Sequence, residues 1–195
     1  MSKLGILFCL TALSVFAQDY KAAAAAGPPD QLATGIREAL QSRGVKIVDP
    51  NGFLFCELWL RSVPLSDSLS MEDAIENGAI PQGALVGVIR FASPGADRRG
   101  QGFGPGLYTL RHSQGDSVLM IKATEDGDLS PPDFDQLLAS SRNVSRTATP
   151  AALRVSKGSS DRSPRLEMTR DGEWIIHTRL GDTPVALLIV GVAKR

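Results

Sequence analysis

The chain has 195 residues, its 21 lysines and arginines are balanced by 21 aspartates and glutamates, and its isoelectric point is about 6.7. A chain of this length can bury a sizeable core of its own as a single domain. Its balanced charge creates no electrostatic field that would concentrate nucleic acid, so we expect no nucleic-acid partner.

Residues 1–17 have the pattern of a secretory signal peptide. Lys3 gives a positive start, residues 4–16 are almost all apolar, and Val15 and Ala17 suit the positions that signal cleavage requires. We therefore predict a secreted or periplasmic protein. Residues 185–192 form the longest later apolar run, far shorter than the roughly 20 residues of a membrane-spanning helix. No transmembrane segment is expected after cleavage.

The predicted cleavage also decides how the two cysteines can be used. Cys9 would leave with the signal peptide, so Cys56 would remain alone and could not close an internal disulfide. The stability of the mature chain must then come from core packing.

The segment after the signal peptide divides into a leader and the start of the fold. Residues 18–29 are rich in alanine, glycine and proline and predict a disordered leader, which leaves residues 30–195 as a single β-rich domain. Asp30 is the expected N-cap of an amphipathic helix of about three turns, and Gly44 is placed for its C-terminal cap. The apolar face of this helix would consist of Leu32, Ile36 and Leu40.

From residue 45 onward, apolar and polar residues alternate with a period of two, which is typical of strands. The short connections favour antiparallel pairing, and Asp171-Gly172 predicts a two-residue hairpin turn. Short helical excursions are expected in residues 62–83 and 133–141. The fold class that follows is mainly β, a two-layer antiparallel β-sandwich with an N-terminal helix. The predicted strands are 45–48, 53–60, 84–91, 106–111, 118–123, 152–155, 165–170, 173–180 and 185–192.

The sequence lacks the motifs of several common nucleotide-binding, metal-binding and catalytic sites. The glycine-rich residues 98–106 continue into a strand, and Pro105 stands where a dinucleotide loop needs its third glycine. His112 and His177 lie far apart, so no zinc-ligand spacing exists. The acidic residues between 125 and 135 lack the ordered spacing of a calcium loop. No Gly-x-Ser-x-Gly elbow presents a nucleophile. We predict no metal site, no cofactor and no catalytic residues.

Glu57 is the most informative polar residue because it lies within an apolar strand. On a regular strand it would share a face with Phe53, Phe55, Trp59 and Arg61, and a carboxylate among aromatics needs a partner when buried. One interpretation is a structural ion pair with Arg61, Arg90 or Arg111, and the other is a sugar-binding face. Arg98, Arg99 and Arg111 could also line a pocket for an anion or carboxylate. The predicted ligand-binding residues are Glu57, Trp59, Arg99, Gln101 and Arg111.

Four segments, residues 56–61, 83–91, 99–101 and 105–111, resemble a family of small secreted proteins of unknown function from soil bacteria of the acidobacterial type. The most specific part runs from Arg-Gly-Gln to Tyr-Thr-Leu-Arg. The resemblance implies an exported β-rich domain and brings no established reaction. Family members carry histidines near positions 116–120 and 149, where this chain has none, so no role based on those histidines is expected.

Together these observations predict an exported, non-catalytic β-sandwich of the cell envelope that binds an envelope protein, a small ligand or a glycan. Two alternatives remain open. One is a secreted hydrolase or glycan-active enzyme that uses carboxylates such as Glu57, with a second carboxyl group about 5 to 10 Å away. The other is a structural subunit whose exposed strand edges pair with another envelope protein.

Overall fold

A single large antiparallel sheet organises the part of the chain that the computed structural model describes. The described residues are 20–62, 83–96, 102–113, 117–123, 152–157, 164–168, 174–180 and 183–189. The strands of the large sheet are β1 (Lys21–Ala24), β2 (Val45–Val48), β3 (Leu54–Leu60), β4 (Leu85–Phe91), β7 (Gly106–His112), β8 (Ser117–Lys122), β9 (Ala152–Lys157), β10 (Arg165–Met168), β11 (Trp174–Leu180) and β12 (Thr183–Ile189). A small hairpin of β5 (Gly95–Ala96) and β6 (Gly102–Phe103) and the helix α1 (Thr34–Ala39) complete the elements.

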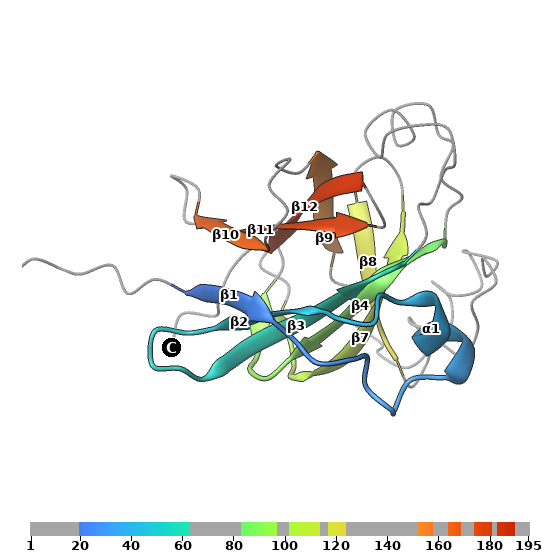
Figure 1. Ribbon diagram of the computed structural model, residues 1–195, viewed down its shortest axis with the longest axis horizontal. Helices are drawn as coiled ribbons and strands as arrows, with labels where there is room; N and C mark the ends of the chain where they lie inside the picture. The colour runs from blue at the N-terminus through green and yellow to red at the C-terminus, as the bar shows by residue number, and fades with distance from the viewer. Residues whose placement is uncertain are drawn as a thin grey trace, which may run out of the picture.

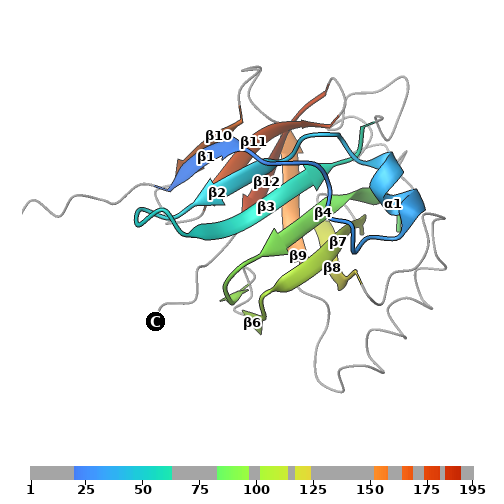
Figure 2. The ribbon, with the colours of Figure 1, turned by 60° about the horizontal axis from the view of Figure 1, so that its bottom comes forward.

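The sheet is continuous and curls around one core. Its ten strands follow the order β1-β2-β3-β4-β7-β8-β9-β12-β11-β10, and all neighbours are antiparallel. The first and last strands of this order, β1 and β10, contact one another. Figures 1 and 2 show β9, β12, β11 and β10 lying across from the strands of the N-terminal half. The mainly antiparallel β architecture is confirmed, but one curled sheet stands where two separate layers were predicted.

The inner face of the curled sheet holds the main core. Cys56, Leu58 and Leu60 of β3 point into it, as their alternation predicts, and meet residues such as Ile176 and Leu187 from the opposite half. Aromatic rings fill one end, where Phe91 packs against Phe55, Phe103 and Tyr108. Because residues from both halves belong to this one cluster, the burial of apolar surface holds the curled sheet closed.

A second apolar cluster lies on the outer face of β3 and β4, beneath residues 25–44, which we call the N-terminal strap. The strap contributes Ala25, Leu32, Ile36 and Leu40, and the sheet contributes Trp59, Leu85 and Val88. The strap approaches the sheet closely at Gly44, where an added Cβ would lie 2.6 Å from the Trp59 indole nitrogen. Only glycine allows this approach, so Gly44 lets the strap pack directly against Trp59.

The structure corrects the predictions for the N-terminal segment. Within the supposedly disordered residues 18–29, Lys21–Ala24 forms strand β1 and pairs with β2. The helix begins at Thr34, and its N-cap is Ala33, without a side-chain capping bond. Asp30 instead accepts a hydrogen bond from the Arg37 guanidinium at 3.1 Å. The helix spans six residues and its C-cap is Leu40, so Gly44 does not end it. Leu32 reaches the apolar cluster from a turn that precedes the helix.

The other predictions concern the strands and the excursions. Each predicted strand is present within a few residues of its expected bounds. The interiors of the expected excursions, residues 63–82 and 133–141, lie outside the described residues. Within the described ranges, no helix has both the length and the apolar character needed to cross a membrane.

The strap provides the first testable prediction. Ile36 is buried between α1 and the sheet, so Ile36→Ala should lower the free energy of unfolding by about 2–5 kcal/mol. The matched control is Glu38→Ala on the exposed side of α1, which should change it by less than about 0.5 kcal/mol. Urea unfolding followed by circular dichroism measures both, and equal effects would contradict the packing of the strap on the sheet.

Candidate functional site

Glu57 is buried on the outer face of the sheet and forms an ion pair with Arg90, whose side chain is 42% exposed. Glu57 is opposite Arg90 in the β3–β4 register and is 8% exposed. Arg90 Nη2 donates to Glu57 Oε2, and the Arg90 guanidinium carbon lies 5.9 Å from the centroid of the Trp59 ring. A cation held between a carboxylate and an aromatic face satisfies both neighbours. Of the predicted partners, the structure therefore selects Arg90.

Trp59 is enclosed beneath the strap. Its side chain is 1% exposed, and its indole nitrogen donates to the Ala26 carbonyl oxygen at 2.8 Å. A sugar ring stacks on an aromatic face only when that face is open to solvent. The strap therefore covers the Trp59 face that a sugar would need, and Glu57, Arg90 and Trp59 have the arrangement of a structural cluster.

The remaining predicted ligand-binding residues do not join this cluster. Arg111 is fully buried and donates from Nη1 to the Gly83 carbonyl oxygen at 3.0 Å. Leu107 of β7 is opposite Arg90, and Arg111 lies four positions further along the same strand. Four positions correspond to roughly 13 Å, so Arg111 is too far from Arg90 to join the cluster. Arg99 and Gln101 lie outside the described residues.

A β-bulge changes the neighbours that the sequence assigned to Glu57. The pairing of β2 with β3 shifts between Ile47 and Val48, which inserts Phe55 as an extra residue. Phe55 consequently packs in the inner core with Cys56 rather than on the outer face with Glu57. Phe53 precedes the strand and is exposed. The predicted aromatic face around Glu57 is therefore wrong except for Trp59.

Cys56 points inward, where it contributes packing. Burial raises the pKa of its thiol, and the negative charge of Glu57 raises it further, so the nucleophilic thiolate is suppressed. His112, the last residue of β7, is also buried.

Cys56 gives a second prediction. In the chain beginning at residue 18, Cys56 should resist a thiol-specific disulfide reagent at pH 8 because the thiol is fully buried and protonated. After unfolding in guanidinium chloride it should react at the rate of a model thiol. Stoichiometric labelling of the folded protein within minutes would contradict its place in the core.

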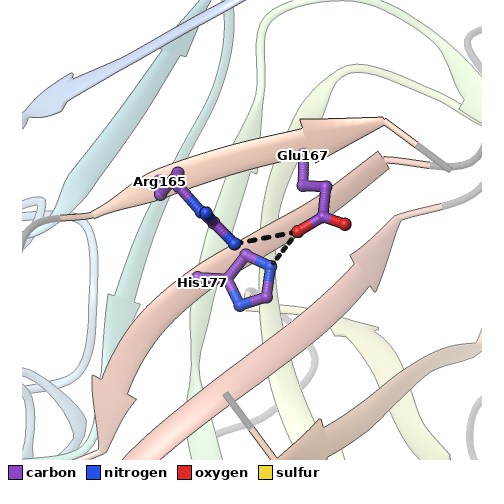
Figure 3. Close-up of polar contacts among 3 residues, drawn as sticks. All are labelled: Arg165, Glu167 and His177. Atoms are coloured by element: carbon purple, nitrogen blue, oxygen red, sulfur yellow. Dashed lines mark hydrogen bonds and ion pairs between the residues drawn. The ribbon is translucent and has the colours of Figure 1, made fainter. Parts of the chain in front are cut away.

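A second charged cluster lies on the outer face of β10 and β11 and consists of Arg165, Glu167 and His177. Glu167 Oε2 accepts from Arg165 Nη2 at 2.9 Å and lies 3.0 Å from His177 Nε2. Figure 3 shows the second oxygen of Glu167 turned away from both partners. The side chains of Arg165 and Glu167 are 52% and 48% exposed, whereas that of His177 is 13% exposed. We call these three residues the β10–β11 cluster.

The register of the hairpin brings this cluster together. Arg165 is opposite His177, and Glu167 is opposite Ile175, so all three polar side chains share one face. Leu166 and Ile176 point to the other face and into the core. The same outer face continues to Leu188 of β12, opposite Ile175, and both are partly exposed. The cluster is thus bordered by accessible apolar surface.

His177 follows the buried Ile176 and therefore points to the other face, but the sequence analysis did not find its partner Glu167. A two-residue turn at Asp171-Gly172 would pair 170 with 173 and therefore Glu167 with Ile176. In the structure Met168 pairs with Trp174, a register shifted by one residue. A shift by one residue reverses the faces of a strand, so the predicted turn would have directed Glu167 into the core. The apolar Leu166 lies between the polar Arg165 and Glu167, and this alternation was the signal that could have corrected the predicted register.

The β10–β11 cluster can exchange hydrogen bonds with an oxygen-rich ligand. Arg165 offers planar N–H donors, and Glu167 offers an acceptor oxygen. Within the described ranges, no group of three or more His, Cys, Asp or Glu side chains could hold a metal ion. A positive guanidinium next to the carboxylate also disfavours a cation.

Comparisons with protein-family models, with curated proteins and with solved structures find no match to this chain. The assignment of function therefore depends on the two charged clusters and on what covers each of them.

The ion pair of Glu57 with Arg90 gives a third prediction. Glu57→Gln leaves Arg90 without its ionic partner and should lower the free energy of unfolding by about 1–3 kcal/mol. Glu167→Gln is the matched control, because an exposed ion pair contributes less than about 1 kcal/mol. A double-mutant cycle of Glu57→Gln with Arg90→Gln should give a coupling energy above about 0.5 kcal/mol. A coupling energy near zero would contradict the pairing.

Proposed function

We propose that this chain is an exported, non-catalytic binding domain of the cell envelope and that its ligand contacts the β10–β11 cluster. The observation that carries the proposal is the half-exposed Arg165 and Glu167 pair beside His177 on the outside of the sheet. Donors and an acceptor stand side by side there, an arrangement that suits the hydroxyl, amide and carboxylate groups of glycans and peptidoglycan fragments.

The ordered geometry of the cluster supports binding over general surface solvation. All three side chains stand on paired strands, and a site on strands is positioned more precisely than one on a loop. Arg165 and His177 share one oxygen of Glu167, which limits the rotation of the carboxylate. A ligand would then meet groups whose conformational entropy is already reduced.

The arrangement of the carboxylates supports a non-catalytic role over a glycan-active enzyme. Hydrolysis by paired carboxylates needs two such groups about 5 to 10 Å apart in a cleft. Glu57 is paired with Arg90 on β3 and β4, whereas Glu167 is paired with Arg165 on the other half of the curled sheet. The two are on outer faces separated by the core, so they do not form such a pair.

Export and membership in the acidobacterial-type family belong to the same proposal. Their support is the signal pattern of residues 1–17 and the four segments named above. A cell-envelope location would place the domain among glycans and peptidoglycan fragments, the ligand chemistry that the cluster suits.

The fourth prediction tests this function by thermal shift. A panel of oligosaccharides, peptidoglycan fragments and small carboxylates should contain a ligand that stabilises the fold, by roughly 2.7 kcal/mol at 100 times its dissociation constant. Glu167→Gln and Arg165→Gln should abolish the shift and keep the melting temperature of the unliganded protein. Glu38→Gln on the strap is the matched control and should retain the shift. A shift that survives Glu167→Gln, or a flat panel, would overturn the assignment.

A further inference from the structure

The β10–β11 cluster presents an unused acceptor at the surface. Both interactions of Glu167 involve Oε2, which accepts from Arg165 Nη2 at 2.9 Å and lies 3.0 Å from His177 Nε2. Within the described part of the chain, the second oxygen of Glu167 has no partner, and Figure 3 shows it turned away from Arg165 and His177. A carboxylate whose side chain is 48% exposed therefore keeps one oxygen for a ligand.

Arg165 keeps a complete pair of parallel donors. A guanidinium group carries five N–H donors, and Nη2 contributes to two edges, one shared with Nε and one shared with Nη1. Glu167 uses one hydrogen of Nη2, so one edge remains complete whichever hydrogen is donated. Arg165 is 52% exposed and forms no other interaction among the described residues. It can therefore bind a carboxylate through two parallel hydrogen bonds while it stays paired with Glu167.

We propose that the ligand of the β10–β11 cluster carries a free α-amino-acid group, that is, an ammonium and a carboxylate on one carbon atom. This inference rests on the proposed function of the cluster and names the chemistry of its ligand. The carboxylate pairs with the open edge of Arg165, and the ammonium donates to the outward oxygen of Glu167.

Charge complementarity favours this group over a sugar and over an ion of one sign. Arg165 and Glu167 carry opposite charges, so an ion of either sign is attracted by one of them and repelled by the other. A sugar hydroxyl is neutral and gains no attraction between opposite charges from either residue. An α-amino-acid group meets each residue with the opposite sign.

The surrounding charges leave Glu167 as the group that selects the ammonium. It is the only acidic side chain on the described residues of β8 to β12. Arg179 lies two positions along β11 from His177, roughly 7 Å further on the same face, and the exposed Lys21 belongs to β1, which contacts β10. His177 adds a positive charge only when it is protonated. These groups attract the carboxylate of the ligand, so the ammonium depends on Glu167.

The apolar border of the cluster fits the side chain of such a ligand. Ile175 is opposite Glu167, and Leu188 is opposite Ile175, so the three form a row across β10, β11 and β12. Ile175 and Leu188 are partly exposed. Side chains directly opposite each other stand about 5 Å apart, which places apolar surface within reach of a small side chain. Leucine combines the required charges with such a side chain.

The fifth prediction compares leucine with two modified forms. N-acetylleucine lacks the ammonium, and leucine amide lacks the carboxylate. Titrations of the ¹⁵N-labelled chain, followed by the amide chemical shifts of Arg165, Glu167 and Ile175, give the dissociation constant of each probe. We expect each modified form to bind at least about threefold more weakly than leucine, since each loses one exposed ion pair.

Two variants assign each charge to its partner. In Glu167→Gln, leucine and N-acetylleucine should bind equally within about twofold, whereas leucine amide should remain weaker. In Arg165→Gln, leucine and leucine amide should become equal instead. Glu38→Gln on the strap is the matched control and should retain both preferences. All three variants should keep the melting temperature of the natural protein, because the replaced side chains are exposed.

The outcomes separate this inference from the proposed function. Equal affinities of the three leucine probes for the natural protein would overturn the inference. An oligosaccharide whose binding requires Glu167, with no binding of leucine, would overturn it and leave the proposed function standing. The absence of any bound probe would overturn both. A peptidoglycan stem peptide that ends in a diamino acid and binds more tightly than leucine would support the inference and identify the source of the group, whereas tighter binding of leucine would support it with a free amino acid as ligand.

Discussion

Strands β3 and β4 are buried on both faces, and this double burial is the constraint on which the rest of the structure depends. Their inner residues need the opposite half of the curled sheet, and their outer residues Trp59, Leu85 and Val88 need a second cover. The N-terminal strap provides that cover. Because the strap leads directly from β1, the same segment that closes the outer face also supplies the edge strand that meets β10.

The two charged clusters differ in how exposed their glutamates are, and the proposed function depends on this difference. Each contains a glutamate bonded to an arginine across or along strands. Glu57 is buried on the same face as Trp59, and its ion pair with Arg90, the residue opposite it, compensates the burial of its charge. The side chain of Glu167 is 48% exposed, and its second oxygen is turned away from Arg165 and His177, as Figure 3 shows. A glutamate–arginine pair thus stabilises the fold on β3 and β4, whereas a similar pair on β10 and β11 is the proposed ligand contact.

The sequence predicts the strands well because period-two burial is a local signal, as in Cys56, Leu58 and Leu60. The sequence does not predict the features that depend on the register between neighbouring strands. The bulge at Phe55 and the one-residue shift at Met168 and Trp174 are set by packing across the sheet, and each moves side chains between faces. The ion pair of Glu57 with Arg90 was one of several open pairings until the strand order was known. The alanine-rich β1 has little strand propensity and forms through its neighbours.

The central claim is that a ligand meets the β10–β11 cluster and leaves the covered face of β3 and β4 untouched. Amide and indole resonances of the ¹⁵N-labelled chain, followed during titration with peptidoglycan fragments and oligosaccharides, test it most directly. We expect the chemical shifts of Arg165, Glu167 and His177 to change in a saturable way while those of Glu57 and the Trp59 indole stay fixed. Changes centred on Glu57 and Trp59 would contradict it, because they would show that the strap yields to a ligand.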